Sequence, residues 1–207
     1  MRCLTLSALA LAFTPTTYAM TCDAPELPEA DTTFESLVAG LHRQLDIPED
    51  YGESRDLDLQ SEAPRLVVAA VDQGQGVFLM SEPAADAWLH MQAAARVDGI
   101  ELFPVSTYRS VLDQMDIISN RLDNGESIDR ILTSSTAPGY SEHHTGDAID
   151  LSTPDSRSLS PEFAETDAFD WLEEHAADYC FELSYSEDNH HGLDFEPWHW
   201  RFKRAQD

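Results

Sequence analysis

An aspartate stands inside an apolar stretch that directly follows two adjacent histidines and a glycine. The stretch reads SEHHTGDAID and runs from Ser141 to Asp150. Gly146 permits a tight turn, and beyond it Ala148 and Asp150 share one face of an expected strand while apolar residues take the other. A carboxylate buried there is costly unless a partner compensates its charge. The fold must supply that partner, and a metal ion held jointly with a histidine before the turn would do so.

A second polar cluster, FEPWHWRF, lies near the C-terminus and places Glu196 and His199 on either side of a proline. Pro197 argues against a helix interior at this point. On a regular strand, the spacing of Glu196 and His199 puts their side chains on opposite faces. The two side chains can therefore face one site only if the backbone turns or bulges at Pro197.

The two clusters together contain the donors that a hydrolytic zinc site requires. Such a site uses three nitrogen or oxygen ligands, an open position for water, and a nearby carboxylate that accepts the proton of that water. Two histidines, one aspartate and one unligated glutamate supply this set. A lone histidine is usually a surface or packed residue, so it is the co-occurrence of these groups that indicates a metal site.

Three ordered motifs show that the sequence resembles a known family. SxHxxGxAxD is complete from Ser141 to Asp150, EPWHxR from Glu196 to Arg201, and YRSxxxQ from Tyr108 to Gln114. The combination is similar to the zinc D-alanyl-D-alanine carboxypeptidases of the vancomycin-resistance type. Their wider group also holds lysostaphin-like enzymes and hedgehog domains. The similarity extends over about residues 81–202.

The resemblance implies one zinc ion, held by two histidines and the strand aspartate: His143, Asp150 and His199. Zinc is accordingly the expected cofactor. His144 fills a position that varies among relatives, and an exchange of roles between the two neighbouring histidines stays open.

The same resemblance implies roles for further residues. Glu196 is the implied general base, and later the acid that protonates the leaving amine. Arg109 is implied to stabilise the oxyanion of the tetrahedral intermediate. Ser141 and Gln114 are implied to hold the substrate. Trp198 either lines the pocket or is a buried structural residue.

The implied reaction is the removal of the terminal D-Ala from peptidoglycan stem pentapeptides by a zinc metallopeptidase, that is, a D,D-carboxypeptidase. Alternatives stay open: a D,D-dipeptidase that cleaves free D-Ala-D-Ala, a peptidoglycan endopeptidase, or a noncatalytic zinc or cell-wall-binding module. Glu196 together with Arg109 favours an enzyme, because a binding module has no need of a general base.

Hydrophobic patterns predict an α+β fold with helices packed on a small, mostly antiparallel sheet, which the hedgehog and D,D-peptidase resemblance also implies. Helices are expected at 34–45, after a cap at Ser81, after Ser110 with Leu112 facing inward, at 127–132, and within 161–179. Strands are expected at 57–59, 66–71, 77–79, 101–106, 148–151, 181–185 and 195–200.

Residues 1–19 have the pattern of a secretory signal peptide. A basic start at Arg2 precedes an apolar run at 4–13 and small residues up to Ala19. The run is much shorter than the ~20 residues that span a bilayer. An acidic lead-in with a short helix is expected at 20–64 and a catalytic domain at 65–207. We therefore expect a secreted or periplasmic protein with no membrane span.

Removal of the signal peptide leaves Cys22 and Cys180 as an even pair in an export compartment, where a disulfide can persist. The sequence alone does not show that they meet. Cys180 also departs from the family, in which a glycine usually precedes the phenylalanine, so the backbone there must accept a side chain.

The chain is strongly acidic, with 12 Lys and Arg against 39 Asp and Glu and a net charge of −27. Such a surface repels nucleic acid and anionic lipid head groups. We therefore expect no nucleic-acid partner. The family resemblance implies peptidoglycan stem peptides as the binding partner, and we expect a monomer.

Overall fold

The computed structural model of the chain describes residues 21–72, 74, 76–154 and 156–205. The expected signal peptide at 1–19 lies outside these residues. The described part combines helices with two small antiparallel sheets, which confirms the expected α+β class. None of its helices combines the length and the apolar character needed to cross a bilayer.

Both sheets are formed by short strands. The larger sheet has the strand order β3-β4-β6-β5, formed by β3 (Phe103–Ser106), β4 (Ala148–Ser152), β6 (His199–Phe202) and β5 (Phe181–Leu183). The smaller sheet is the hairpin of β1 (Val67–Val71) and β2 (Val77–Met80). In the larger sheet, Asp150 on β4 pairs directly with His199 on β6. This register brings together side chains that are far apart in the sequence.

All but one of the described α-helices begin at a polar side chain that caps them. The α-helices are α1 (Thr32–Gln44), α2 (Tyr51–Arg55), α3 (Glu82–Val97), α4 (Val111–Asp123), α5 (Ile128–Ser134) and α6 (Asp167–His175), with 3-10 turns η1 (Glu142–Thr145), η2 (Pro161–Glu165) and η3 (Ala176–Tyr179). Ser81 caps α3, and Ser110 forms a full capping box with Asp113 at the start of α4. These side chains accept hydrogen bonds from backbone N–H groups that would otherwise lack a partner.

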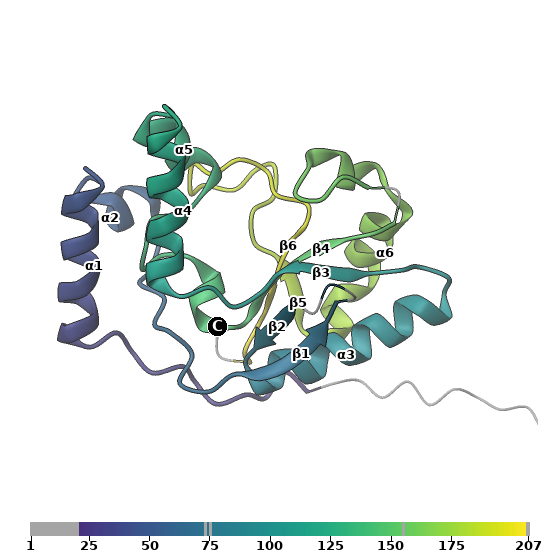
Figure 1. The fold of residues 1–207 in the computed structure, drawn as a ribbon. Helices are drawn as coiled ribbons and strands as arrows, with labels where there is room; N and C mark the ends of the chain where they lie inside the picture. The colour runs from purple at the N-terminus through teal and green to yellow at the C-terminus, as the bar shows by residue number, and fades with distance from the viewer. Residues whose placement is uncertain (1–20, 73, 75, 155, 206–207) are drawn as a thin grey trace, which may run out of the picture.

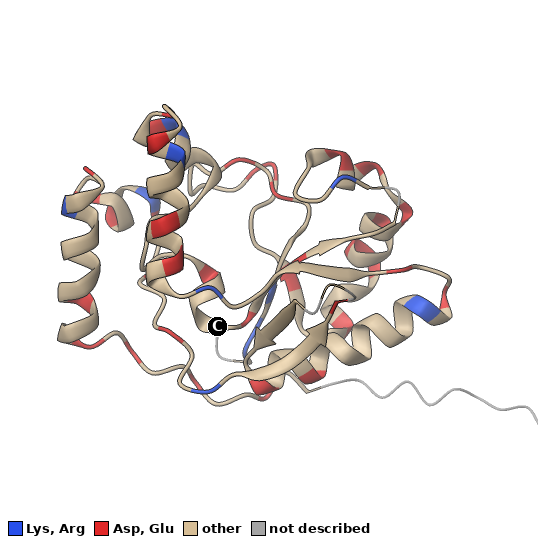
Figure 2. Ribbon diagram, in the orientation of Figure 1, with Lys and Arg blue, Asp and Glu red and all other residues tan. Residues whose placement is uncertain are grey.

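The helices form two groups around the sheet. Figure 1 shows α1, α2, α4 and α5 gathered to its left, and α3 and α6 below it and to its right. The main core lies between α3, α6 and the larger sheet, where Trp88, Met91 and Phe181 are buried. The left-hand group has its own apolar contacts, which join α4 to α5 and α1 to Val111 at the start of α4. Acidic residues are spread over both groups, and basic residues are sparse (Figure 2).

The first part of α4 corrects one expectation. Leu112, expected to face inward, has 56% of its surface exposed. The buried residues of α4 are Val111, Gln114 and Ile118, which share one face at helical spacing. Leu112 follows Val111 by one position and therefore turns away from that face.

Two strand expectations were also wrong. No strand forms at 57–59, because α2 precedes this segment and ends at Asp56 in a left-handed conformation, after which Leu57 N–H donates to the Gly52 carbonyl. The strand expected from 195 starts only at His199, because residues 196–199 form a turn. The helical pattern at 161–179 is divided into η2, α6 and η3, with Thr166 capping α6.

A disulfide ties the acidic lead-in to the sheet. Cys22 is bonded to Cys180, with their Cα atoms 5.6 Å apart, and Ala205 N–H donates to the Cys22 carbonyl. Cys180 has a φ of 62°, the left-handed conformation that favours glycine. Cys180 thus keeps the backbone conformation that a glycine would adopt at this position, and its side chain forms the disulfide.

A buried ion pair links the C-terminal segment to the metal-site motif. The guanidinium of Arg204 contacts both carboxylate oxygens of Asp147, at 2.8 and 2.9 Å, and Ser81 donates to the same carboxylate. Arg204 also donates to the Pro25 carbonyl of the lead-in. The pair therefore connects the lead-in, the start of α3 and the segment between η1 and β4.

Replacing Arg204 with methionine tests how much this ion pair contributes to the stability of the fold. In Arg204→Met, the Asp147 carboxylate stays buried without its cation, so the free energy of unfolding should fall by about 3–5 kcal/mol. The matched control is Lys203→Met, because Lys203 forms an exposed pair with Glu182 and such pairs contribute only about 0–1 kcal/mol. Chemical denaturation measures both, and equal stability of the two variants would contradict the account.

Candidate metal centre

Three side chains from different elements meet in the interior. His143 comes from η1, Asp150 from β4 and His199 from β6, and all three are buried. One ligand atom from each lies within 4.8 Å of the others, an arrangement that could hold a metal ion. These are the three residues that the family resemblance implied.

The Asp150 carboxylate shows which imidazole nitrogens face the centre. One of its oxygens lies 3.2 Å from His143 Nε2, and the other lies 2.9 Å from His199 Nδ1. The outer nitrogens have other partners: His143 Nδ1 lies 2.6 Å from the Thr107 carbonyl, and His199 Nε2 lies 2.8 Å from the Glu142 carboxylate. Both outer partners are acceptors, so with a metal ion at the centre each histidine could keep a proton on its outer nitrogen and offer the lone pair of its inner nitrogen to the ion.

The turn before β4 depends on a glycine. Gly146 has a φ of 70°, and a Cβ atom added there would lie 2.9 Å from the backbone nitrogen of Ser81. The Ser81 N–H donates to the Gly146 carbonyl. Only glycine fits this close approach, which sets how the chain passes from His143 to Asp150.

Electrostatics keep the centre charged. Burial favours a neutral acid, but His143 and His199 hold the pKa of Asp150 well below its usual range. Burial alone would lower the pKa of His199, yet its hydrogen bonds to Asp150 and Glu142 raise that pKa to about 10. A proton on His199 thus balances two buried carboxylates in the absence of a cation, and a divalent cation at the same place can take over that balance.

Glu196 reaches the same space through a turn. The His199 N–H donates to the Glu196 carbonyl at 3.0 Å, which is the turn that the spacing around Pro197 required. Glu196 and His199 consequently both line one cavity of about 370 Å³, together with His143 and Asp150. Burial raises the pKa of the Glu196 carboxyl to about 7. The charge of a nearby cation would bring it down again.

Arg109 also faces the cavity. Its Nη2 lies 3.3 Å from Ser141 Oγ, while its buried Nε has no hydrogen-bond partner within the described residues. Arg109 and Ser141 both line the cavity, as does Trp198. An unpaired guanidinium N–H at this place can donate a hydrogen bond to an anionic oxygen.

Gln114 lies behind the cavity instead. It is fully buried, and its Nε2 donates to the Thr136 carbonyl at 2.7 Å. Thr136 lines the cavity, whereas Gln114 is not among the described residues that do so. Gln114 therefore supports the cavity wall through Thr136 and does not line the cavity itself.

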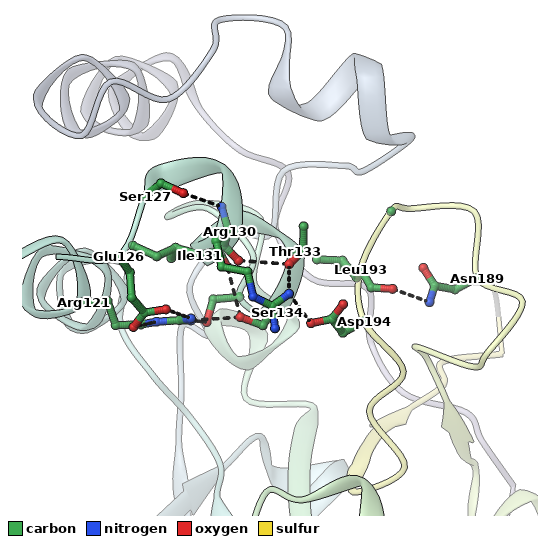
Figure 3. A network of polar contacts seen from close by, with 12 residues as sticks. Arg121, Glu126, Ser127, Arg130, Ile131, Thr133, Ser134, Asn189, Leu193 and Asp194 are labelled. Atoms are coloured by element: carbon green, nitrogen blue, oxygen red, sulfur yellow. Dashed lines mark hydrogen bonds and ion pairs between the residues drawn. The ribbon is translucent and has the colours of Figure 1, made fainter. Parts of the chain in front are cut away.

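Another part of the wall is held by a polar network between α5 and the segment that leads to Glu196 (Figure 3). Arg130 donates to Thr133 and pairs with Asp194 at 3.1 Å, and Asp194 N–H donates to the Thr133 carbonyl. Arg121, which lies on α4, donates to Ser134, which lies on α5. Ser134 and Asp194 line the cavity. The network fixes the segment just before Glu196 against a helix.

His144 is turned away from the metal centre. Its Nδ1 donates to the Arg109 carbonyl at 2.7 Å, and its Nε2 accepts from the Gly139 N–H at 3.1 Å. Burial lowers its pKa to about 4, so the ring is neutral at pH 7 with one donor and one acceptor. The structure thus separates the two neighbouring histidines, since His143 faces Asp150 and His144 braces the backbone of Arg109.

Sequence reasoning missed residues around the metal centre. Glu142 stands at a position that the motif leaves unspecified, and Tyr185, whose ring centroid lies 4.8 Å from that of His199, belongs to none of the three motifs. Thr107 contributes only its carbonyl oxygen to His143. A backbone acceptor leaves no signal in the sequence, whereas the carboxylate directly before His143 was visible there.

Comparisons with known proteins agree with this geometry. Residues 78–205 match the family VanY: D-alanyl-D-alanine carboxypeptidase. YodJ of Bacillus subtilis (strain 168), which is named as a carboxypeptidase, is 31% identical over 172 residues, or 81% of this chain. This chain belongs to the D-alanyl-D-alanine carboxypeptidase family. It spans 60% of the length of YodJ.

Solved structures show the same fold. The LdcB LD-carboxypeptidase is 30% identical, with a TM-score of 0.60 over 69% of this chain and 70% of its own. The vancomycin-resistance D,D-dipeptidase VanXYg, in complex with a D-Ala-D-Ala phosphinate analogue, is 28% identical, with a TM-score of 0.61 over 72% of this chain and 60% of its own. Peptidases with different substrates therefore share this architecture.

The brace formed by His144 can be tested with two substitutions. Glutamine also offers one donor and one acceptor, so His144→Gln should keep both hydrogen bonds and nearly the full stability. His144→Leu leaves the Arg109 carbonyl and the Gly139 N–H unpaired, at a cost of about 1–3 kcal/mol for each group. Denaturant unfolding compares the two, and a leucine variant as stable as the glutamine variant would refute the brace.

Proposed function

We propose that this protein is a zinc D,D-carboxypeptidase that removes the terminal D-Ala from peptidoglycan stem pentapeptides. One observation carries the proposal: His143, Asp150 and His199 meet at a cavity that Glu196 and Arg109 also line. Membership of the D-alanyl-D-alanine carboxypeptidase family supports the same reaction.

The donor set suits zinc. Two imidazole nitrogens and one carboxylate are ligands that catalytic zinc sites use, with a fourth position left for water or substrate. His143 Nε2 and His199 Nδ1 are the nitrogens that face the centre and could serve as these ligands. A zinc ion bound by these residues would supply Lewis-acid activation of the attacking water and of the scissile carbonyl.

Glu196 is the proposed general base. Its carboxylate lines the cavity beside the ligands, and its pKa is about 7 before any cation is bound. Beside a bound cation Glu196 would be ionised at neutral pH, so it could accept the proton of the attacking water. The same carboxyl group then protonates the departing amine of D-Ala.

Arg109 is the proposed oxyanion partner. Its unpaired, buried Nε and its Nη2 provide donors that a developing negative charge could use. Ser141 accepts from Arg109 and thereby orients the guanidinium, besides offering a hydroxyl to the substrate. Gln114 would act more indirectly, by fixing Thr136 in the cavity wall.

A D,D-dipeptidase is the second candidate. VanXYg, a D,D-dipeptidase by name, matches this chain as well as LdcB does. The catalytic constellation is compatible with either substrate, because both end in D-Ala-D-Ala. The cavity wall formed by α5 and the segment before Glu196 would decide how much peptide precedes the scissile bond.

We further propose that residues 1–19 direct export, that 20–64 buttress the catalytic domain at 65–207, and that the protein acts as a secreted or periplasmic monomer. The Cys22–Cys180 disulfide supports an oxidising compartment. The buttress is supported by backbone hydrogen bonds from Gln60 to Gly139 and from Ala63 to His144.

The proposal is tested by D-Ala release from a pentapeptide-ending muropeptide, with free D-Ala-D-Ala as a parallel substrate. The purified mature protein should release D-Ala from the muropeptide, and a chelator should abolish the release. Cleavage of the free dipeptide alone would identify a dipeptidase. No cleavage of either substrate would contradict the proposal.

The role of Glu196 gives a separate prediction. Glu196→Ala should bind zinc with the stoichiometry of the wild type, since Glu196 is not a ligand. Its rate of D-Ala release should fall by at least about 10²–10⁴-fold, the usual contribution of a general acid–base group. Metal analysis and a turnover assay on the same sample measure both, and an active variant would refute the assignment.

A further inference from the structure

We propose that Glu142 is a positioning residue for the metal centre, because it fixes the ring and the tautomer of His199. The inference shares the metal centre of the proposed function but needs nothing from the substrate. Glu142 lies between Ser141 and His143, at a position that the motif SxHxxGxAxD leaves unspecified.

The contact between the two side chains is direct. Glu142 Oε2 lies 2.8 Å from His199 Nε2; the His199 side chain is buried, with 3% of its surface exposed, and the Glu142 side chain is partly buried, with 12% exposed. Arg201 Nη1 lies 3.3 Å from Glu142 Oε1, so the second carboxylate oxygen has a cationic partner. A carboxylate in this setting stays ionised and can only accept a hydrogen bond.

The direction of that hydrogen bond selects the ligand atom. Because Glu142 can only accept, Nε2 of His199 must carry the proton that it donates. The nitrogen left for a metal ion is Nδ1, which faces Asp150 at 2.9 Å. A side chain able to donate at position 142 would permit the opposite tautomer, with the proton on Nδ1 and no lone pair toward the centre.

The ring is also held against rotation. The ring of Tyr185 lies over His199 with an interplanar angle of 30°, and the His143 ring meets it edge-on at a centroid distance of 5.0 Å. These contacts restrict the plane of the imidazole, whereas the hydrogen bond to Glu142 fixes its direction within the plane. Glu142 thus does for His199 what the Thr107 carbonyl does for His143, and its charge also raises the basicity of the ligand.

Glu142→Gln tests the inference with little change of shape. The amide can donate to Nε2 as well as accept from it, so the preference for the productive tautomer is lost. Zinc affinity, measured by competition with a chromophoric chelator, should fall by about 10–100-fold, as it does when other outer partners of metal ligands are removed. Glu182→Gln is the control, because Glu182 pairs with Lys203 at the surface.

A nitrogen NMR measurement on the wild type keeps the test independent of folding in the variant. In the zinc-loaded protein, the shifts of His199 should show a protonated Nε2 and a metal-bound Nδ1. A protonated Nδ1 would overturn the inference, and so would a zinc affinity of Glu142→Gln equal to that of the control. Neither readout uses a peptide substrate, so a failure of the proposed peptidase activity would leave the inference standing, and the reverse also holds.

Discussion

The structure depends on one buried carboxylate placed between two imidazoles. Asp150 lies on β4, one of the two inner strands of the larger sheet, where its register with β6 puts it opposite His199, and the turn at Gly146 brings His143 to its other oxygen. An isolated carboxylate at this depth would be strongly destabilising. Its ionised form is tolerated because histidines, and the cation that they can share, compensate the charge. The register of β4 with β6 and the turn at Gly146 therefore determine the geometry of the metal centre.

The surrounding elements make that centre usable for chemistry. The turn at Pro197 directs Glu196 into the cavity, and the contacts of α5 with Asp194 hold the segment that precedes it. His144 braces Arg109 through its backbone, and Glu142 and Thr107 bind the outer nitrogens of the two facing histidines. The groups at the cavity thus rest on a second layer of hydrogen bonds, which limits their movement when a substrate enters.

Much of this could be predicted from the sequence, because the decisive residues lie within short motifs. The helix cap at Ser81, the strand that carries Asp150, and the need for a turn at Pro197 all follow from local spacing. The sequence could not show which face of α4 is buried, since that depends on which helix packs against it. It could not show the Cys22–Cys180 bond or the partner of Glu142 either, because these contacts join segments that only the complete fold brings together.

The most direct test of the account is anomalous X-ray diffraction at the zinc edge from crystals of the zinc-loaded protein. The account predicts one strong peak, about 2.0–2.2 Å from His143 Nε2, His199 Nδ1 and an oxygen of Asp150. Glu196 should lie beside the ion without binding it. A peak at another place, or a ligand set that includes His144 or His199 Nε2, would contradict the account.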